Sequence, residues 1–541
     1  MNSMRIICNM TIQRQRGAAM MIMLVIMIIG VITFLVGALS SSSMKSARDQ
    51  QAADVLVQAK DALIGRAVSD ASHPGSLPCP DNSAPGSPLW GTAPGTTYSG
   101  GHCPSYIGRL PWKTLGIPEL HDANGEDLWY ALSPTLRDNN AAQPINSDTP
   151  GWLSLTGTIT LNNVAAVIFA PGAAICGQSR SSTATANQYL ETLSTISTTG
   201  PTPISVRSAS NDCSNFPYND NLLAITTDQI FQPVEKRLVR EVKACLDTYA
   251  GSSANKYPWP ALTSDTTYTS ASGTLFGRVP TQPTINIPLN VGNTSNSKII
   301  NMLNALAAVQ TAVNQCLQPG GDTNANQNAL ANAGTTLVNA AQAVAGAQPT
   351  APAITSSVTN PAINAGQYAQ YSNRCDNINN NGNTTVQNNL ASANSALSSI
   401  LVPEDPSMSM AWPTGCFIAG TYWDDWKNLV FYQVADSFRP NGTLTCANNC
   451  LSVTGSGSSA TGSGSYHAVA IVSRKYISTD APPSPPSRTV TNAAAYLEPI
   501  NLLPQAYSTN IPPYNTFRPI DPSFQTVNDL VQCLDGNVNC K

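Results

Sequence analysis

Charged side chains are scarce in this sequence. Asp, Glu, Lys and Arg make up 11% of its 541 residues, and the formal net charge is −4. No basic cluster lies outside the first 17 residues, although clusters of Lys and Arg are the usual means of binding nucleic acid. Polarity comes instead from Asn, Ser, Thr and Gln. We therefore expect no nucleic-acid partner.

Histidine is also rare, and the residue patterns of common catalytic and metal sites are missing. No two of the four His residues are spaced to share one helical face, and there is no His-Glu-x-x-His or Cys-x-x-Cys motif. No Ser lies in a Gly-x-Ser-x-Gly elbow between a strand and a helix. We therefore expect a protein that is not an enzyme and that has no cofactor.

Calcium is the one ligand that the oxygen-rich loops suggest. Asp122, Asn124, Glu126 and Asp127 place oxygen atoms on one short loop, and the loops 322–326 and 376–381 are rich in Asn. Calcium takes about 6–8 oxygen ligands, usually with several carboxylates among them. The Asn-rich loops are better explained as turns or helix caps, and we expect the first loop to be a turn between strands.

One long apolar run lies near the N-terminus. From Ala18 to Leu39 only Thr33 is notably polar, and a helix of this length measures about 33 Å, enough to cross a hydrocarbon core of about 30 Å. Three basic residues precede the run with no acidic residue among them: Arg5, Arg14 and Arg16. The positive-inside rule then predicts a cytoplasmic N-terminus and an extracytoplasmic location for the rest of the chain.

The start of this run resembles a type IV prepilin signal, in which a Gly follows basic residues and directly precedes the apolar segment. The resemblance implies that a prepilin peptidase cuts after Gly17 and leaves Ala18 as the new N-terminus. Most pilins of the family carry Glu at the fifth mature position, where it neutralises the terminal ammonium of a neighbour, but here this position is Ile22. Because an uncompensated buried charge is costly, the missing Glu favours a tip or initiating position over the filament shaft.

The N-terminal run is also compatible with a secretory signal or a plain membrane anchor. A cleaved secretory signal has a shorter apolar region of about 7–15 residues, but the small residues at 38–40 resemble its cleavage site. A plain membrane anchor would keep its leader intact. The three alternatives differ in the residue with which the processed protein begins.

The helix is predicted to continue beyond the membrane. Apolar residues keep helical spacing from Ala52 to Ala67, so Ala18–Ser69 forms one helix of roughly 75–80 Å. Leu128–Leu132 and Val164–Phe169 are β-prone runs between turn signals. We expect an α+β fold, in which a long N-terminal helix, first transmembrane and then amphipathic, packs on an antiparallel sheet.

Short matches in a shared order indicate that one unit occurs twice. The matched pairs are 60–67 with 243–250, 78–80 with 258–260, 107–111 with 276–280, 128–132 with 430–434, 153–157 with 451–455, 164–167 with 469–472, and 186–191 with 493–498. Near the C-terminus, Val531–Asp535 weakly matches the helix end at Lys243–Asp247. Both units contain a Gly-Arg pair, Gly108-Arg109 and Gly277-Arg278. In each pair we expect an unusual Gly backbone angle and an Arg tied to a carboxylate.

The expected domains follow from this repeat. Residues 1–17 form the leader peptide, 18–39 the transmembrane part of the helix, 40–225 the first pilin-like unit and 226–541 the second related α+β unit. The second copy is longer by a segment at about 282–413, in which apolar residues at helical spacing predict a helical insertion. Helices are expected there at 299–317, 330–344 and, more weakly, 386–401.

Thirteen Cys are present, and removing Cys8 of the leader leaves twelve outside the membrane. An even number in an oxidising compartment indicates disulfides. Their connectivity cannot be deduced, but three pairs are close enough in sequence to close local loops: Cys79 with Cys103, Cys446 with Cys450, and Cys533 with Cys540. The last pair resembles the C-terminal disulfide loop of many type IV pilins.

The resemblance to the type IV pilin-like and pseudopilin family covers Arg14 to about Gly200 and reaches the second unit only through the repeat. It implies a minor structural component, a tip or priming subunit, of a type IV pilus or type II secretion machinery. Its partners would be other pilin or pseudopilin subunits, a prepilin peptidase and the bacterial inner membrane. The bulk of the chain would then be periplasmic or at the cell surface.

Two alternative functions stay open. A pilus-tip or surface adhesin would be favoured by an exposed aromatic patch on the second unit or its insertion. A membrane-anchored periplasmic enzyme or sensor would require a concave cluster of ionisable groups.

Overall fold

The computed structural model describes residues 13–94, 102–137, 144–181, 185–210, 212–347, 354–371, 375, 382–446, 450–453, 462–475, 488–502, 516–517 and 527–534, without the side chains of 13–19, 35–43, 382–383, 462–465 and 516. It has a mixed α+β fold with largely antiparallel sheets. The chain divides into two compact units, Met1–Val234 and Glu235–Lys541. The division falls a few residues after the expected boundary, inside helix α3 (Thr227–Ser252).

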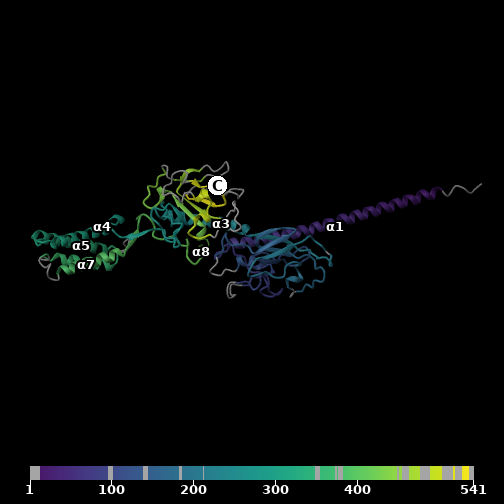
Figure 1. The fold of residues 1–541 in the computed structure, drawn as a ribbon, viewed down its shortest axis with the longest axis horizontal. Helices are drawn as coiled ribbons and strands as arrows, with labels where there is room; N and C mark the ends of the chain where they lie inside the picture. The colour runs from purple at the N-terminus through teal and green to yellow at the C-terminus, as the bar shows by residue number, and fades with distance from the viewer. Residues whose placement is uncertain are drawn as a thin grey trace, which may run out of the picture. The chain divides into compact units, whose positions relative to one another are not determined.

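Helix α1 runs unbroken over 57 residues, Gln13–Ser69 (Figure 1). Its C-terminal part contacts strands β4 and β6 of the first unit, through a face whose side chains recur every three or four residues and are buried: Ala52, Leu56, Ala59, Leu63 and Ala67. Within the part of the chain that the structure describes, no helix combines the length and the apolar character needed to cross a membrane.

The first unit is built on one six-stranded sheet. Its strands are β1 (Ile107–Arg109), β2 (Trp129–Leu132), β3 (Leu153–Gly157), β4 (Leu161–Ala170), β5 (Thr202–Val206) and β6 (Asn221–Thr226). They lie in the order β1-β2-β4-β3-β5, and β6 also pairs with β4. All pairs are antiparallel except β3 with β5. The short helices are α2 (Trp112–Leu115), η1 (Pro134–Leu136) and η2 (Ala186–Gln188).

Strands β2 and β4 form the centre of this unit, and both of their faces are buried. Helix α1 lies on one face. The segment that follows η2 covers the other, because Tyr189, Leu190 and Leu193 share a core cluster with Trp129 and Phe169. Strands enclosed on both sides read as continuous apolar runs, which explains the sequences Trp-Tyr-Ala-Leu and Val-Ala-Ala-Val-Ile-Phe-Ala.

The second unit repeats this topology. Helix α3 precedes a four-stranded sheet in the order β15-β13-β10-β7 and a three-stranded sheet in the order β12-β11-β14. The strands are β7 (Phe276–Arg278), β10 (Val430–Val434), β11 (Leu451–Val453), β12 (Gly462–Tyr466), β13 (Ala468–Val472), β14 (Thr516–Phe517) and β15 (Leu530–Leu534). Short helices lie between them: α8 (Trp423–Trp426), η5 (Lys427–Leu429), η6 (Asp436–Phe438), η7 (Ala493–Ala495) and α9 (Pro499–Leu502).

The equivalence extends to register. Gly108 lies opposite Tyr130 in the first unit, and Gly277 lies opposite Tyr432 in the second. The path β6-β4-β2-β1 corresponds to β15-β13-β10-β7, and the parallel pair of β3 with β5 corresponds to the parallel pair of β11 with β14. Both units therefore share this strand pairing, although the first unit joins the strands in one sheet and the second divides them between two.

Two of the sequence matches were wrong. Val167 lies opposite Ala131 and Val469 opposite Gln433, so Val167 corresponds to Val469, three residues away from the match of Val164 with Val469. Short Ala and Val runs have no unique marker, and only cross-strand pairing sets their register. Residues 530–534 are strand β15, the counterpart of β6, and not a repeat of the helix end at 243–247.

The insertion of the second unit is a helical bundle with its own core. Its helices are α4 (Ser297–Cys316), α5 (Asn324–Ala345), α6 (Ser356–Gln370) and α7 (Gly382–Ser398) (Figure 1). The paired strands β8 (Asn286–Pro288) and β9 (Leu401–Pro403) enclose the bundle in the sequence, and η3 (Val291–Asn293) follows β8. Helix α6 was missed because it contains Pro361 and its buried face is largely Ala. Such a face packs closely: a Cβ on Gly334 of α5 would lie 2.6 Å from the Gly366 carbonyl oxygen.

Disulfides are present within each unit. Cys79–Cys103 and Cys446–Cys450 are two of the three pairs expected from sequence proximity. The structure also contains Cys176–Cys213, Cys245–Cys416 and Cys316–Cys375, which join cysteines too far apart in sequence to be matched by spacing. Cys533 is disulfide-bonded, while Cys540 lies outside the described residues.

Candidate functional site

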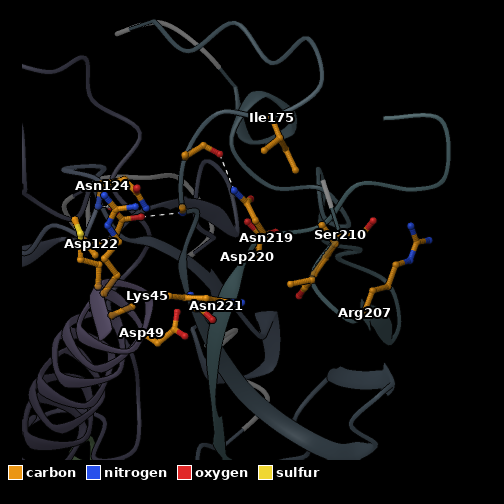
Figure 2. A pocket seen from close by; sticks show the side chains of 18 residues that line it. Lys45, Asp49, Asp122, Asn124, Ile175, Arg207, Ser210, Asn219, Asp220 and Asn221 are labelled. Carbon is orange, nitrogen blue, oxygen red and sulfur yellow. Dashed lines mark hydrogen bonds between the residues drawn. The ribbon is translucent and has the colours of Figure 1, made fainter. Parts of the chain in front are cut away.

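A cleft of about 800 Å³ opens on the first unit beside α1. Figure 2 shows Lys45 and Asp49 of α1 along one side, with Asn219, Asp220 and Ser210 on loops that face it. The lining is polar and carries both signs of charge, since it also includes Arg48, Arg207 and Asp122. Such a surface suits a polar partner of mixed charge better than an apolar ligand.

The loop weighed as a calcium site is the expected turn. Asp122 Oδ1 accepts the backbone N–H groups of Asn124 (2.7 Å) and Glu126 (3.0 Å), and its Oδ2 accepts that of Gly172 (2.8 Å). Glu126 pairs with Arg180 at 3.1 Å. The carboxylates of this loop thus bind separate partners, and Asp122 closes the turn and ties it to the end of β4.

Three side chains beside this turn could hold a metal ion. Ligand atoms of Glu119, His121 and Asp127 all lie within 4.8 Å of one another. Asp127 also lies 3.4 Å from the guanidinium of Arg109. Burial, opposed by the positive charge of Arg109, raises the pKa of Asp127. The neighbouring cation and the raised pKa of Asp127 both oppose metal binding at this cluster.

The repeated Arg residues stack on aromatic rings in both units. The Arg109 guanidinium lies 5.2 Å from the Trp129 ring and 5.5 Å from that of Tyr189, and Arg278 lies 4.3 Å from Phe431 and 4.9 Å from Tyr496. In each unit the Arg meets a ring of the neighbouring strand and the Tyr that follows the η helix. Cation–π contacts strengthen when the cation is desolvated, and both Arg are buried.

The expected roles of the Gly-Arg pairs were partly wrong. Arg109 pairs with the carboxylate of Asp127, but Arg278 donates to the backbone carbonyls of Asn428 and Val490 (3.0 Å). Neither Gly has a positive φ. Each is needed because another segment crosses it closely: a Cβ on Gly108 would lie 2.6 Å from the Asp81 carbonyl oxygen, and one on Gly277 would lie 1.8 Å from that of Ala261.

A second Arg and an acid pair are also repeated, and sequence analysis missed both. Arg180 lies 5.1 Å from Tyr189 and donates to the Gly172 carbonyl, and Arg488 lies 5.1 Å from Tyr496 and donates to the equivalent carbonyl of Arg474. The acid pairs are Glu191 with Asp220, and Glu498 with Asp529. The available signal was the dipeptide Asn-Asp before β6 and again before β15.

The residues of the prepilin resemblance lie on α1. Gly17 and Ala18 belong to the helix, but their side-chain surroundings lie outside the described part of the structure. Ile22 is 61% exposed. None of the three positions is among the residues that line the cleft.

Comparison with known proteins finds no match to a family model, to a curated protein or to a solved structure.

Proposed function

We propose that this protein is a minor pilin-like or pseudopilin-like structural component of a type IV pilus or type II secretion machinery. Helix α1 would lie in the bacterial inner membrane with a cytoplasmic N-terminus and pass from lipid into a bundle of sister helices. The two units would then be periplasmic or at the cell surface, at the tip or the initiating position of the assembly. The work of such a subunit is non-covalent.

The observation that carries the proposal is the contrast between the two parts of α1. The large apolar side chains from Met20 to Phe34 are between 48% and 77% exposed, whereas the face from Ala52 to Ala67 packs on the sheet of the first unit. A continuous exposed apolar surface indicates a contact with lipid or with another protein. A helix that packs on a sheet with its C-terminal part and presents an exposed apolar surface with its N-terminal part fits a pilin subunit.

Ile22 supports a tip position over the shaft. It stands where the resemblance expects Glu, and its exposed side chain (61%) continues the apolar surface of neighbouring residues. A subunit without this carboxylate leaves the terminal ammonium of a neighbour uncompensated in an apolar bundle. One such subunit at an end of the filament avoids that repeated penalty.

N-terminal sequencing of the full chain, expressed with and without a prepilin peptidase, tests the proposal. We expect Ala18 as the first residue only when the peptidase is present, and no cleavage in Gly17→Leu. Gly30→Ala is the matched control, since no other heavy atom lies within 4 Å of the added Cβ, and it should be processed normally. A chain beginning at Ser41 would instead indicate a secreted protein, and an intact leader in both expressions a static anchor.

A tip adhesin is the second candidate, because the insertion carries exposed aromatic side chains. Tyr368 at the end of α6 is 40% exposed, and Tyr371 is 62% exposed. The bundle around them is almost free of charge, since residues 297–398 contain only Lys298, Asp322, Arg374 and Asp376 as charged residues. Exposed tyrosines on a neutral, amide-rich surface suit a neutral polar ligand such as a glycan.

Glycan-array binding of the full chain tests this candidate. The double variant Tyr368→Ala/Tyr371→Ala is expected to lose binding while it keeps its thermal unfolding temperature. Tyr466→Phe, in the sheet region of the second unit, is the control and should bind like the wild type. Equal binding by the double variant would exclude this surface as an adhesin site.

A further inference from the structure

The two units share a pair of carboxyl groups at the same place in the fold. In the first unit, Asp220 Oδ2 accepts the backbone N–H of Glu191 (3.1 Å), and Glu191 Oε2 accepts those of Asn219 (3.2 Å) and Asp220 (3.3 Å). In the second unit, Asp529 Oδ2 accepts the backbone N–H of Glu498 (3.4 Å). Each pair joins the segment after the η helix to the residue that precedes the last strand.

The two Asp are buried and the two Glu are half-buried, and three of their carboxyl oxygens lack a hydrogen-bond donor among the described residues. Asp220 is 6% exposed and Asp529 is fully buried. Asp220 Oδ1, Asp529 Oδ1 and Glu498 Oε2 are buried oxygens that accept no hydrogen bond from the residues that the structure describes. A buried carboxylate oxygen without a donor is costly, and in both pairs the neighbouring group is a second carboxyl. The atom that would satisfy both sides is a proton.

We propose that each acid pair is a proton-binding site, in which one proton is shared between the two carboxyl groups at neutral pH and holds the η segment against the last strand. A buried carboxylate and a second carboxylate beside it repel each other, whereas a carboxylic acid donates a strong O–H···O⁻ hydrogen bond to a carboxylate. In both units the Asp before the last strand accepts the backbone N–H of the Glu after the η helix, and this shared pairing in different surroundings argues that it belongs to the fold. This site does not depend on the proposed function.

The charges around the two pairs differ. The negative charge of Glu191 disfavours the ionised form of Asp220, and the positive charge of Arg180 favours it. Burial raises the pKa of the Tyr218 hydroxyl most, and both acids lie close enough to raise it further. The negative charge of Glu498 disfavours the ionised form of Asp529. The neutral side chain of Asn501 donates a hydrogen bond to Asp529 Oδ2 at 3.0 Å. Burial first, and the paired Glu second, raise the pKa of both Asp residues well above the usual range. The pair of the second unit, with no cation among these contacts, should hold its proton more firmly.

A shared proton makes stability depend on pH in a definite direction. Because the folded-state pKa is raised above the unfolded value, the contribution is complete below the unfolded pKa of about 4 and is lost as pH rises through the folded-state pKa. Between these two values each pair changes the unfolding equilibrium constant tenfold per pH unit. Both units should therefore be more stable in weakly acidic than in alkaline medium.

The test compares urea unfolding of the full chain in detergent at pH 5 and pH 9. We expect the wild-type midpoint to fall at pH 9, and Asp529→Asn and Asp220→Asn each to reduce this fall, because an amide keeps the hydrogen bond without the second charge. Asp265→Asn is the control. Burial raises the pKa of Asp265, but hydrogen bonds from Thr267 and Thr269 together outweigh it and lower the pKa, so this variant should leave the fall at pH 9 unchanged.

A spectroscopic readout separates a proton from a purely structural role. The infrared spectrum of the wild type at pH 7 should show the carbonyl stretch of a protonated carboxylic acid, which weakens in Asp529→Asn and in Glu498→Gln. If Asp529→Asn does not fold, the wild-type band and Glu498→Gln still decide the question. The proposal is overturned if the wild type lacks the band, if the variants keep the full fall in midpoint, or if Ca²⁺ at pH 7 stabilises the wild type but not Asp529→Asn.

Discussion

Replacement of Gly277 by Ala should break the outer edge of the sheet in the second unit. The new Cβ would lie 1.8 Å from the Ala261 carbonyl oxygen, whereas ordinary contacts begin at 3.4 Å. The segment that contains Ala261 must therefore move by about 1.6 Å, the difference between these two distances. This segment and β7 are held together by reciprocal backbone bonds, Ala261 N–H to Arg278 O (3.0 Å) and Arg278 N–H to Ala261 O (2.9 Å).

The expected cost follows from those bonds. A displacement of this size lengthens both beyond hydrogen-bonding distance, and each buried group left without a partner costs about 1–3 kcal/mol. We therefore expect Gly277→Ala to lower the free energy of unfolding by about 3–5 kcal/mol. Gly108→Ala meets the equivalent Asp81 oxygen at 2.6 Å, so a smaller shift relieves it and we expect a loss of about 1–3 kcal/mol.

Gly251→Ala is the matched control. Gly251 lies in α3, and no other heavy atom lies within 4 Å of the position that its Cβ would take. Ala at a helical position is favoured over Gly by about 0.5–1 kcal/mol. Urea unfolding followed by tryptophan fluorescence measures all three variants. The reasoning fails if Gly277→Ala stays within about 1 kcal/mol of the wild type while Gly251→Ala behaves as expected.

Three further predictions concern the second unit. The Cys245–Cys416 disulfide closes a loop of 171 residues, and its removal should lower the free energy of unfolding by up to about 5 kcal/mol. Removal of Cys446–Cys450, with a separation of 4, should cost about 2 kcal/mol. Denaturation of the paired Cys→Ala variants under non-reducing conditions measures both. Burial raises the pKa of Asp405, but hydrogen bonds from Lys256 and other donors outweigh it and lower the pKa to about 2. After allowance for solvent screening, the ionised Asp405 carboxylate contributes about 1–2 kcal/mol to the free energy of unfolding. This contribution is present above pH 4 and is lost as pH falls towards 2. Asp405→Asn should remove this acid sensitivity in urea titrations. Arg278→Lys should destabilise the unit by about 2–4 kcal/mol, since an ammonium cannot both stack on Phe431 and reach two separate carbonyls. Thermal unfolding measures this loss, and the control variant Arg240→Lys should unfold at the wild-type temperature.

Local sequence patterns predicted much of the architecture. The spacing of Ala52, Leu56, Ala59, Leu63 and Ala67 gave the buried face of α1, because a helix repeats its contacts every three to four residues whatever it packs on. The order of the internal matches predicted two related sheets, and the registers at Gly108 and Gly277 agree with those matches. In both cases neighbours along the chain carry the information.

Contacts between distant residues were beyond the sequence patterns. The match of Val164 with Val469 was three residues out of register, because a run of small apolar residues pairs equally well in several registers until its neighbouring strands are in place. The Gly residues of the Gly-Arg pairs were assigned an unusual backbone angle. What requires a residue without a side chain is instead a crossing segment, Asp81 for Gly108 and Ala261 for Gly277, which lies 27 and 16 residues earlier in the chain. Helix α6 was missed because Ala gives a weak periodic signal that only its close fit against α5 explains.

By itself, the sequence determined the long amphipathic helix, the repeated unit and the position of the insertion, since each depends on residues close together in the chain or on ordered motifs. It also made two short-range disulfides expected without deciding their connectivity. Only the tertiary structure decided that Glu191 meets Asp220 and Glu498 meets Asp529, that two Arg stack on one Tyr in each unit, and that Cys245 bonds to Cys416. Those groups are ordinary residues when considered singly. Burial beside one particular partner alters their charge, their hydrogen bonding and their reactivity, and that partner is chosen by the fold.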